Sequence, residues 1–75
     1  MDRQRERLID SGVNGIFDYL LKLEREYELP KSHWTLDSEL KEPIRKALQE
    51  ELTGKETAEQ VAGIVRRLVR EELEI

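Results

Sequence analysis

The chain has 75 residues, of which 40% are charged and 37% hydrophobic, and its formal net charge is −4. This length is enough for one domain and too short for two, so we expect a single domain over residues 1–75. The absence of cysteine excludes disulfides and thiolate metal sites. No apolar run approaches the roughly 18 residues of a membrane span. The negative net charge makes nucleic acid an unlikely partner. We expect a cytoplasmic protein without a membrane partner.

Apolar residues at helical spacing predict a first helix over residues 3–28. They follow one another by 4, 3, 4, 3 and 4 positions: Ile9, Val13, Ile16, Leu20, Leu23 and Tyr27. Gly12 and Gly15 interrupt the pattern, and each costs a helix interior roughly 1 kcal/mol relative to alanine. We favour one bent or frayed helix; the alternative is a short N-terminal turn followed by a helix that Asn14 caps. Pro30 ends the helix, because the residue before a proline avoids the α conformation.

A second helix is predicted over residues 40–53. Its apolar positions recur at helical spacing: Leu40, Ile44, Ala47, Leu48 and Leu52. Pro43 fits the first turn of a helix, where its missing N–H is not needed, so regular helix should begin near Leu40. Residues 30–36 then form a connector, and Gly54 is expected to be a left-handed C-cap.

The third helix is predicted over residues 57–74, and it is the segment around which the chain is organised. Thr57 and Gln60 have the spacing of a capping box. Apolar residues cover about half of the helix circumference, more than the stripe of roughly 100° that one neighbouring helix needs. The helix should therefore pack against more than one element. Together the segments predict an all-α fold, a small three-helix bundle with a C-terminal helical hairpin.

The broad apolar face of the last helix also predicts self-association. Val65 lies near the middle of this face and is expected in the core, whereas Ile64 lies roughly 100° away on its flank. Ile64, Leu68 and Ile75 would then form an exposed apolar strip, which small monomers usually avoid. We expect a homodimer with these three residues at its interface.

Trp34 is the only tryptophan of the chain, and it follows the only histidine, His33. The favoured interpretation is a core role, in which Trp34 closes the open end of the bundle, because the indole has a large area to bury. The alternative is an interface anchor, since tryptophan is enriched among binding hot spots. We expect His33 to be a loop residue without a catalytic or metal-binding role.

Three arginines on the polar face of the last helix offer a different function. Arg66, Arg67 and Arg70 could contact DNA if the final hairpin were a helix-turn-helix. Glu71 and Glu74 lie one turn beyond Arg67 and Arg70, however, and can pair with them. A solvated helix face is therefore favoured over nucleic-acid binding, which remains the alternative.

No motif in the sequence predicts catalysis, a metal site or a cofactor. There is no cysteine nucleophile, no histidine placed to activate a serine, no EF-hand loop and no glycine-rich phosphate loop. Paired Glu-x-x-His motifs of a di-iron bundle are also missing. The prediction is a non-enzymatic helical interaction module, such as a small regulator, inhibitor or assembly factor, whose partner is a second copy or another protein.

One short segment resembles a known structural element. The stretch GKETAEQVAGI, from Gly54 to Ile64, is similar to the closing helical hairpin of bacterial ABC-transporter solute-binding proteins. In that family the hairpin is structural, so the resemblance implies a hairpin here and assigns no ligand-binding residue.

Overall fold

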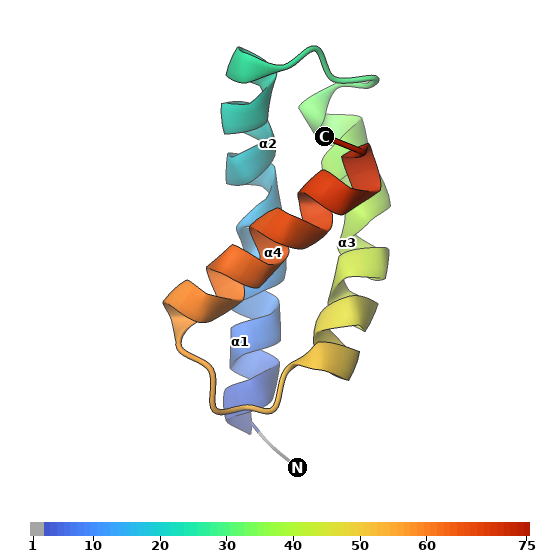
Figure 1. The fold of residues 1–75 in the computed structure, drawn as a ribbon. Helices are drawn as coiled ribbons and strands as arrows, with labels where there is room; N and C mark the ends of the chain where they lie inside the picture. The colour runs from blue at the N-terminus through green and yellow to red at the C-terminus, as the bar shows by residue number, and fades with distance from the viewer. Residues whose placement is uncertain (1–2) are drawn as a thin grey trace.

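The first helical region is divided at a single residue. The computed structural model describes residues 3–75, and in it α1 (Arg3–Asn14) and α2 (Ile16–Glu26) are separated only by Gly15 (Figure 1). Gly15 keeps near-helical angles, and its N–H donates to the carbonyl of Ser11 at 3.2 Å. The two helices therefore form one interrupted rod, as the favoured interpretation predicted. The alternative is wrong, because Asn14 ends a helix of 12 residues and does not cap α2.

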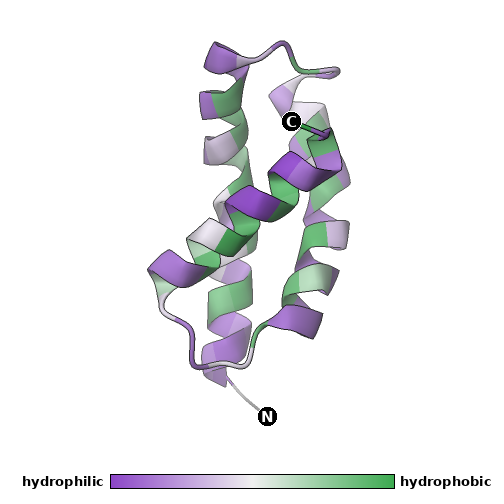
Figure 2. Ribbon diagram, viewed as in Figure 1, coloured by the Kyte–Doolittle hydropathy of each residue, from purple (hydrophilic) through white to green (hydrophobic). Residues whose placement is uncertain are grey.

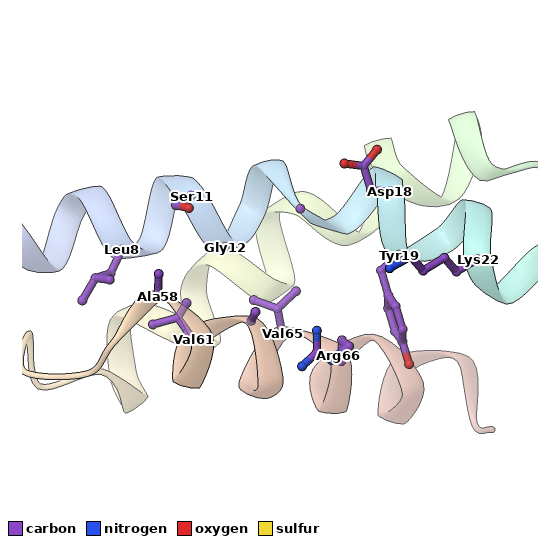
Figure 3. Close-up of a pocket in the computed structure, with 12 residues that line it drawn as sticks. Leu8, Ser11, Gly12, Asp18, Tyr19, Lys22, Ala58, Val61, Val65 and Arg66 are labelled. Carbon is purple, nitrogen blue, oxygen red and sulfur yellow. The ribbon is translucent and has the colours of Figure 1, made fainter.

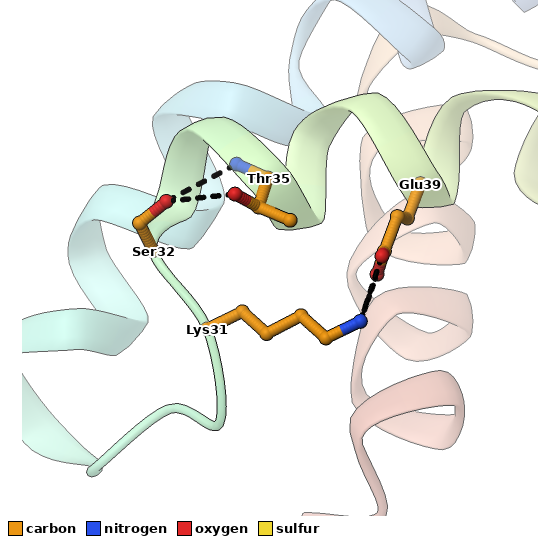
Figure 4. Close-up of polar contacts among 4 residues, drawn as sticks. All are labelled: Lys31, Ser32, Thr35 and Glu39. Carbon is orange, nitrogen blue, oxygen red and sulfur yellow. Dashed lines mark hydrogen bonds and ion pairs between the residues drawn. The ribbon is translucent and has the colours of Figure 1, made fainter.

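The second helix begins seven residues earlier than predicted. Helix α3 runs from His33 to Glu51, so the expected connector over residues 30–36 is largely helical. Ser32 is the N-cap: its hydroxyl accepts from the Thr35 N–H at 3.3 Å, and Lys31 pairs with Glu39 at 2.7 Å across the first turns (Figure 4). The Ser32 N-cap therefore starts the helix at His33, and the expected start near Leu40 is wrong.

Pro43 consequently lies inside α3 and not in its first turn. A proline in a helix removes one backbone hydrogen bond, here the one to the carbonyl of Glu39. Pro43 is exposed, and the buried positions on either side of it continue at intervals of four residues: Leu36, Leu40, Ile44, Leu48 and Leu52. Burial of this apolar row explains why the helix continues through the proline.

The link between α3 and α4 (Ala58–Leu73) carries the chain past the start of α1. Leu52 is the extended C-cap of α3, and its carbonyl accepts from Arg5 Nε at 3.0 Å. Gly54 has the expected positive φ, 97°, but lies two residues beyond the cap. As a result, α4 crosses diagonally over both the α1–α2 rod and α3, as Figure 1 shows, and does not lie alongside α3 as a simple hairpin would.

Helix α4 begins where the sequence predicts. The Thr57 hydroxyl accepts from the Gln60 N–H at 3.1 Å, and the Gln60 side chain accepts from the Thr57 N–H at 2.9 Å. Both halves of the capping box are therefore formed. Helix α4 ends one residue earlier than predicted, at Leu73, with Glu74 in the left-handed conformation.

The core lies where α4 crosses the other helices. Its buried side chains come from every helix: Leu8, Ile9, Val13, Ile16, Leu20, Leu23, Leu36, Leu40, Ile44, Leu48, Leu52, Val61, Val65 and Val69. Figure 2 shows the same division, with apolar bands turned inward and hydrophilic bands outward. Tyr27, the last member of the predicted heptad row, is 39% exposed because α2 ends before it. No strand occurs in residues 3–75, and the predicted all-α fold is confirmed.

Candidate interaction surfaces

Trp34 lies on the surface and does not close the bundle. Its side chain is 70% exposed, so the favoured interpretation of a core plug is wrong. The indole instead packs against the Phe17 ring, with centroids 4.8 Å apart, and against His33 at 5.4 Å. Because α3 already starts at His33, Trp34 is in its first turn, and helical geometry turns the indole outward. The result is a supported but solvent-facing aromatic platform of Phe17, His33 and Trp34.

This platform lies on the side of the α2–α3 seam that faces away from α4. Gly12 contacts α4 through Val61 and Val65, and at 100° per residue Phe17 lies about 140° further around the α1–α2 rod. Apart from the four helices and their links, residues 3–75 contain no further element that could cover this side (Figure 1). We call the side of the α1–α2 rod and α3 that carries Phe17, His33 and Trp34 the open face.

His33 is held by a carboxylate of α2. Its Nδ1 lies 2.7 Å from Glu24 Oε2, and its backbone N–H donates to the same oxygen at 3.1 Å. Hydrogen bonding with the His33 side chain lowers the pKa of Glu24 from its usual value. His33 is thus part of the α3 start and of the aromatic platform, not the loop residue that the sequence predicted.

Two further pairs of opposite charges border the open face. Arg45 donates to Asp10 at 2.7 Å, which joins α3 to α1, and Lys41 pairs with Asp37 at 3.3 Å within α3. The second carboxylate oxygen of Asp37 is buried and has no hydrogen-bond partner among the described residues. Two pairs of opposite charge along this seam are therefore matched inside the chain, and the aromatic surface lies beside them.

The flank of α4 exposes less apolar surface than predicted. Val65 is 3% exposed, which confirms its expected place in the core. Ile64 and Leu68 are half-buried and pack against that core, whereas Ile75 is 40% exposed beyond the end of α4. The diagonal crossing of α4 explains the difference, because a helix that contacts α1, α2 and α3 can bury a broad face within one chain.

Two of the three arginines on α4 are engaged within the chain. Arg67 forms ion pairs with Glu51 of α3 and with Glu71 one turn on. Arg70 lies 5.8 Å from the centroid of the Tyr27 ring. Hydrogen bonding with Tyr19, and to a smaller extent with Tyr27, raises the pKa of Arg70. A guanidinium held in this way is less available to a phosphate.

A groove that was not expected from the sequence lies between the α1–α2 rod and α4 (Figure 3). Its volume is about 210 Å³, and its walls are largely apolar. Gly12 permits the crossing beneath it, since a Cβ there would lie 2.9 Å from Val61 Cγ1 and 3.0 Å from Val65 Cγ2. An interior glycine flanked by buried apolar positions is the signal that could have predicted this close approach.

The described residues show no metal-binding cluster and no membrane-spanning helix. Within residues 3–75, no group of three or more His, Asp or Glu side chains is arranged to hold a metal ion. No helix in that range is both long and apolar enough to cross a bilayer.

No family model, curated protein or solved structure matches this chain. The resemblance of the Gly54–Ile64 segment to solute-binding proteins gains no support from these comparisons.

Proposed function

We propose that the protein is a non-enzymatic helical interaction module that associates through its open face. The observation that carries this proposal is Trp34, which is 70% exposed although Phe17 and His33 hold its ring in place. A rigid, amphipathic aromatic side chain presented on a helical face is typical of a binding hot spot.

A second copy of the chain is the partner that the charges favour. The chain carries a net charge of −4, so most approaches between two copies are repulsive. On the open face, Asp10 and Asp37 are paired with Arg45 and Lys41, which removes that repulsion locally. Two open faces could then meet with their aromatic platforms in contact, in an isologous dimer.

The oligomeric state at increasing protein concentration tests this proposal. We expect light scattering to show a dimer whose fraction rises with concentration. Trp34→Glu should weaken the dimer roughly thirtyfold or more, because loss of an interface hot spot costs about 2 kcal/mol or more. Its circular dichroism should remain helical, since Trp34 contributes little to the core.

Ile64→Glu provides the comparison, because Ile64 belongs to the α4 flank predicted from sequence. If Ile64→Glu separates the subunits and Trp34→Glu does not, the flank of Ile64, Leu68 and Ile75 is the interface. A wild-type chain that stays monomeric at high concentration would contradict self-association. The exposed Trp34 would then be left for a different protein.

A further inference from the structure

The groove between the α1–α2 rod and α4 has the form of a small binding site. Gly12, Ala58 and Ala62 line it with little side-chain volume, while Leu8, Val61 and Val65 supply apolar walls (Figure 3). The small residue Gly12 lets the two helices approach closely at the crossing. A groove of about 210 Å³ can hold a short apolar chain.

Two cations without partners border this apolar space. Lys22 of α2 and Arg66 of α4 both line the groove, and neither forms an ion pair or hydrogen bond with another residue in the described part of the chain. Four other cations, Lys31, Lys41, Arg45 and Arg67, are paired with carboxylates, whereas Arg25, Lys46 and Lys55 form no ion pair in the described residues and lie outside this groove.

One carboxylate also lines the groove. Asp18 is one turn before Lys22, and its side chain points away from α4 in Figure 3. It forms no ion pair with Lys22 or Arg66. The groove therefore combines an apolar floor with a local excess of positive charge, in a chain whose net charge is negative.

We propose that this groove binds a monomeric amphipathic carboxylate with one unbranched alkyl chain. The alkyl chain would lie against Ala58, Ala62 and Tyr19, which line the groove and keep accessible surface, and the carboxylate would lie between Lys22 and Arg66. Burial of the alkyl chain supplies most of the affinity, and the two cations select the anionic head group. The site is separate from the open face, which lies on the other side of the α1–α2 rod.

Decanoate below its micelle concentration is the probe, and decanol and decyltrimethylammonium are the controls for charge. Backbone amide shifts of the folded protein, followed by two-dimensional NMR, report the site. We expect saturable shifts at Gly12, Gly15 and Ala62, with decanoate binding about five- to tenfold more tightly than decanol, since exposed ion pairs contribute modestly. Decyltrimethylammonium should bind most weakly.

Matched charge variants separate the groove from general electrostatics. Lys22→Gln with Arg66→Gln should reduce decanoate affinity about five- to tenfold and leave decanol binding unchanged. Arg3→Gln with Lys46→Gln makes the same change in net charge outside the groove and should affect neither ligand. If both double variants lose the same affinity, or if decanoate and decanol bind equally well, the proposal is wrong.

Ala62→Leu fills the groove and should abolish binding of both decanoate and decanol. Should this variant unfold, Ala58→Leu takes its place, because Ala58 is exposed in the first turn of α4 and also lines the groove. Decanoate shifts that persist in a folded filled variant would contradict the site. Binding seen only with phospholipid vesicles containing decanoate would identify a membrane surface as the ligand and would also overturn the proposal.

Discussion

At the scale of single residues, two glycines inside helices have opposite physical roles. Gly12 is buried where α1 meets α4, and a Cβ at this position would lie 2.9 Å from Val61 Cγ1 and 3.0 Å from Val65 Cγ2. Both valines are in the core, so neither can move without shifting α4. Gly63 lies within α4, and a Cβ there would meet nothing within 4 Å. Only Gly12 is required by packing.

Alanine at these two positions should therefore change stability in opposite directions. Gly12→Ala should lower the free energy of unfolding by about 1–3 kcal/mol, because overpacking outweighs the gain in helix propensity. Gly63→Ala should raise it by about 0.5–1 kcal/mol, since the helix gains propensity without a clash. Urea unfolding of both variants measures the difference. Equal stabilisation by the two substitutions would show that α4 does not approach α1 closely at Gly12.

At the scale of elements, the α3–α4 link is held by one carboxylate. Glu56 accepts from the N–H of Thr53 at 3.0 Å and from the N–H of Gly54 at 3.0 Å, and the Thr53 hydroxyl also donates to it at 3.2 Å. The hydrogen bond from the Thr53 backbone is the main cause that lowers the pKa of Glu56 below 4.5. Glu56 thus satisfies backbone donors that follow the end of α3 and directs the chain toward α4.

The sign of this pKa shift predicts a pH dependence. A carboxyl group whose pKa is lower in the folded state than in the unfolded state stabilises the protein at pH values above its unfolded-state pKa. That contribution disappears as the pH falls through the folded-state pKa. Glu56→Gln should therefore be less stable than wild type at pH 7, and the gap should begin to narrow near pH 4.5 and close under more acidic conditions. Thermal unfolding of both proteins across this range tests it.

Glu42→Gln is the control for this measurement, because Glu42 is exposed and forms no ion pair with the residues described. A stability gap between wild type and Glu56→Gln that is unchanged from pH 7 to strongly acidic conditions would show that the charge of Glu56 does not hold the link.

At the scale of the whole molecule, the diagonal position of α4 divides the surface into two different sides. On one side α4 buries its broad apolar face against three other helices and leaves a groove with unpaired cations. On the other side the α2–α3 seam is uncovered and presents Trp34. The single crossing helix therefore explains both proposed surfaces.

The charge of the whole molecule predicts no appreciable binding to duplex DNA. The net charge is −4, and Arg67 and Arg70 have partners within the chain, so few counterions would be released on binding. Titration with mixed-sequence DNA at about 0.1 M salt, where screening is moderate, checks this expectation. Low-micromolar binding that Arg66→Glu together with Arg70→Glu abolishes would instead support the nucleic-acid alternative.

Features with local causes could be predicted from the amino-acid sequence. The capping box of Thr57 and Gln60, the positive φ of Gly54 and the all-α fold depend on residues a few positions apart, and all three were predicted. The burial of Val65 also followed from periodicity within one helix.

The start of α3 and the contacts of each apolar face depend on long-range packing. Pro43 suggested a late helix start, but burial of the row from Leu36 to Leu52 outweighs the hydrogen bond that the proline removes. Trp34 was expected inside, and the earlier start of α3 turns it outward. The path of the α3–α4 link sets the crossing of α4, and therefore the burial of Ile64 and the groove above Gly12. These features depend on contacts between distant segments, and helical periodicity carries no information about the angle at which two helices cross.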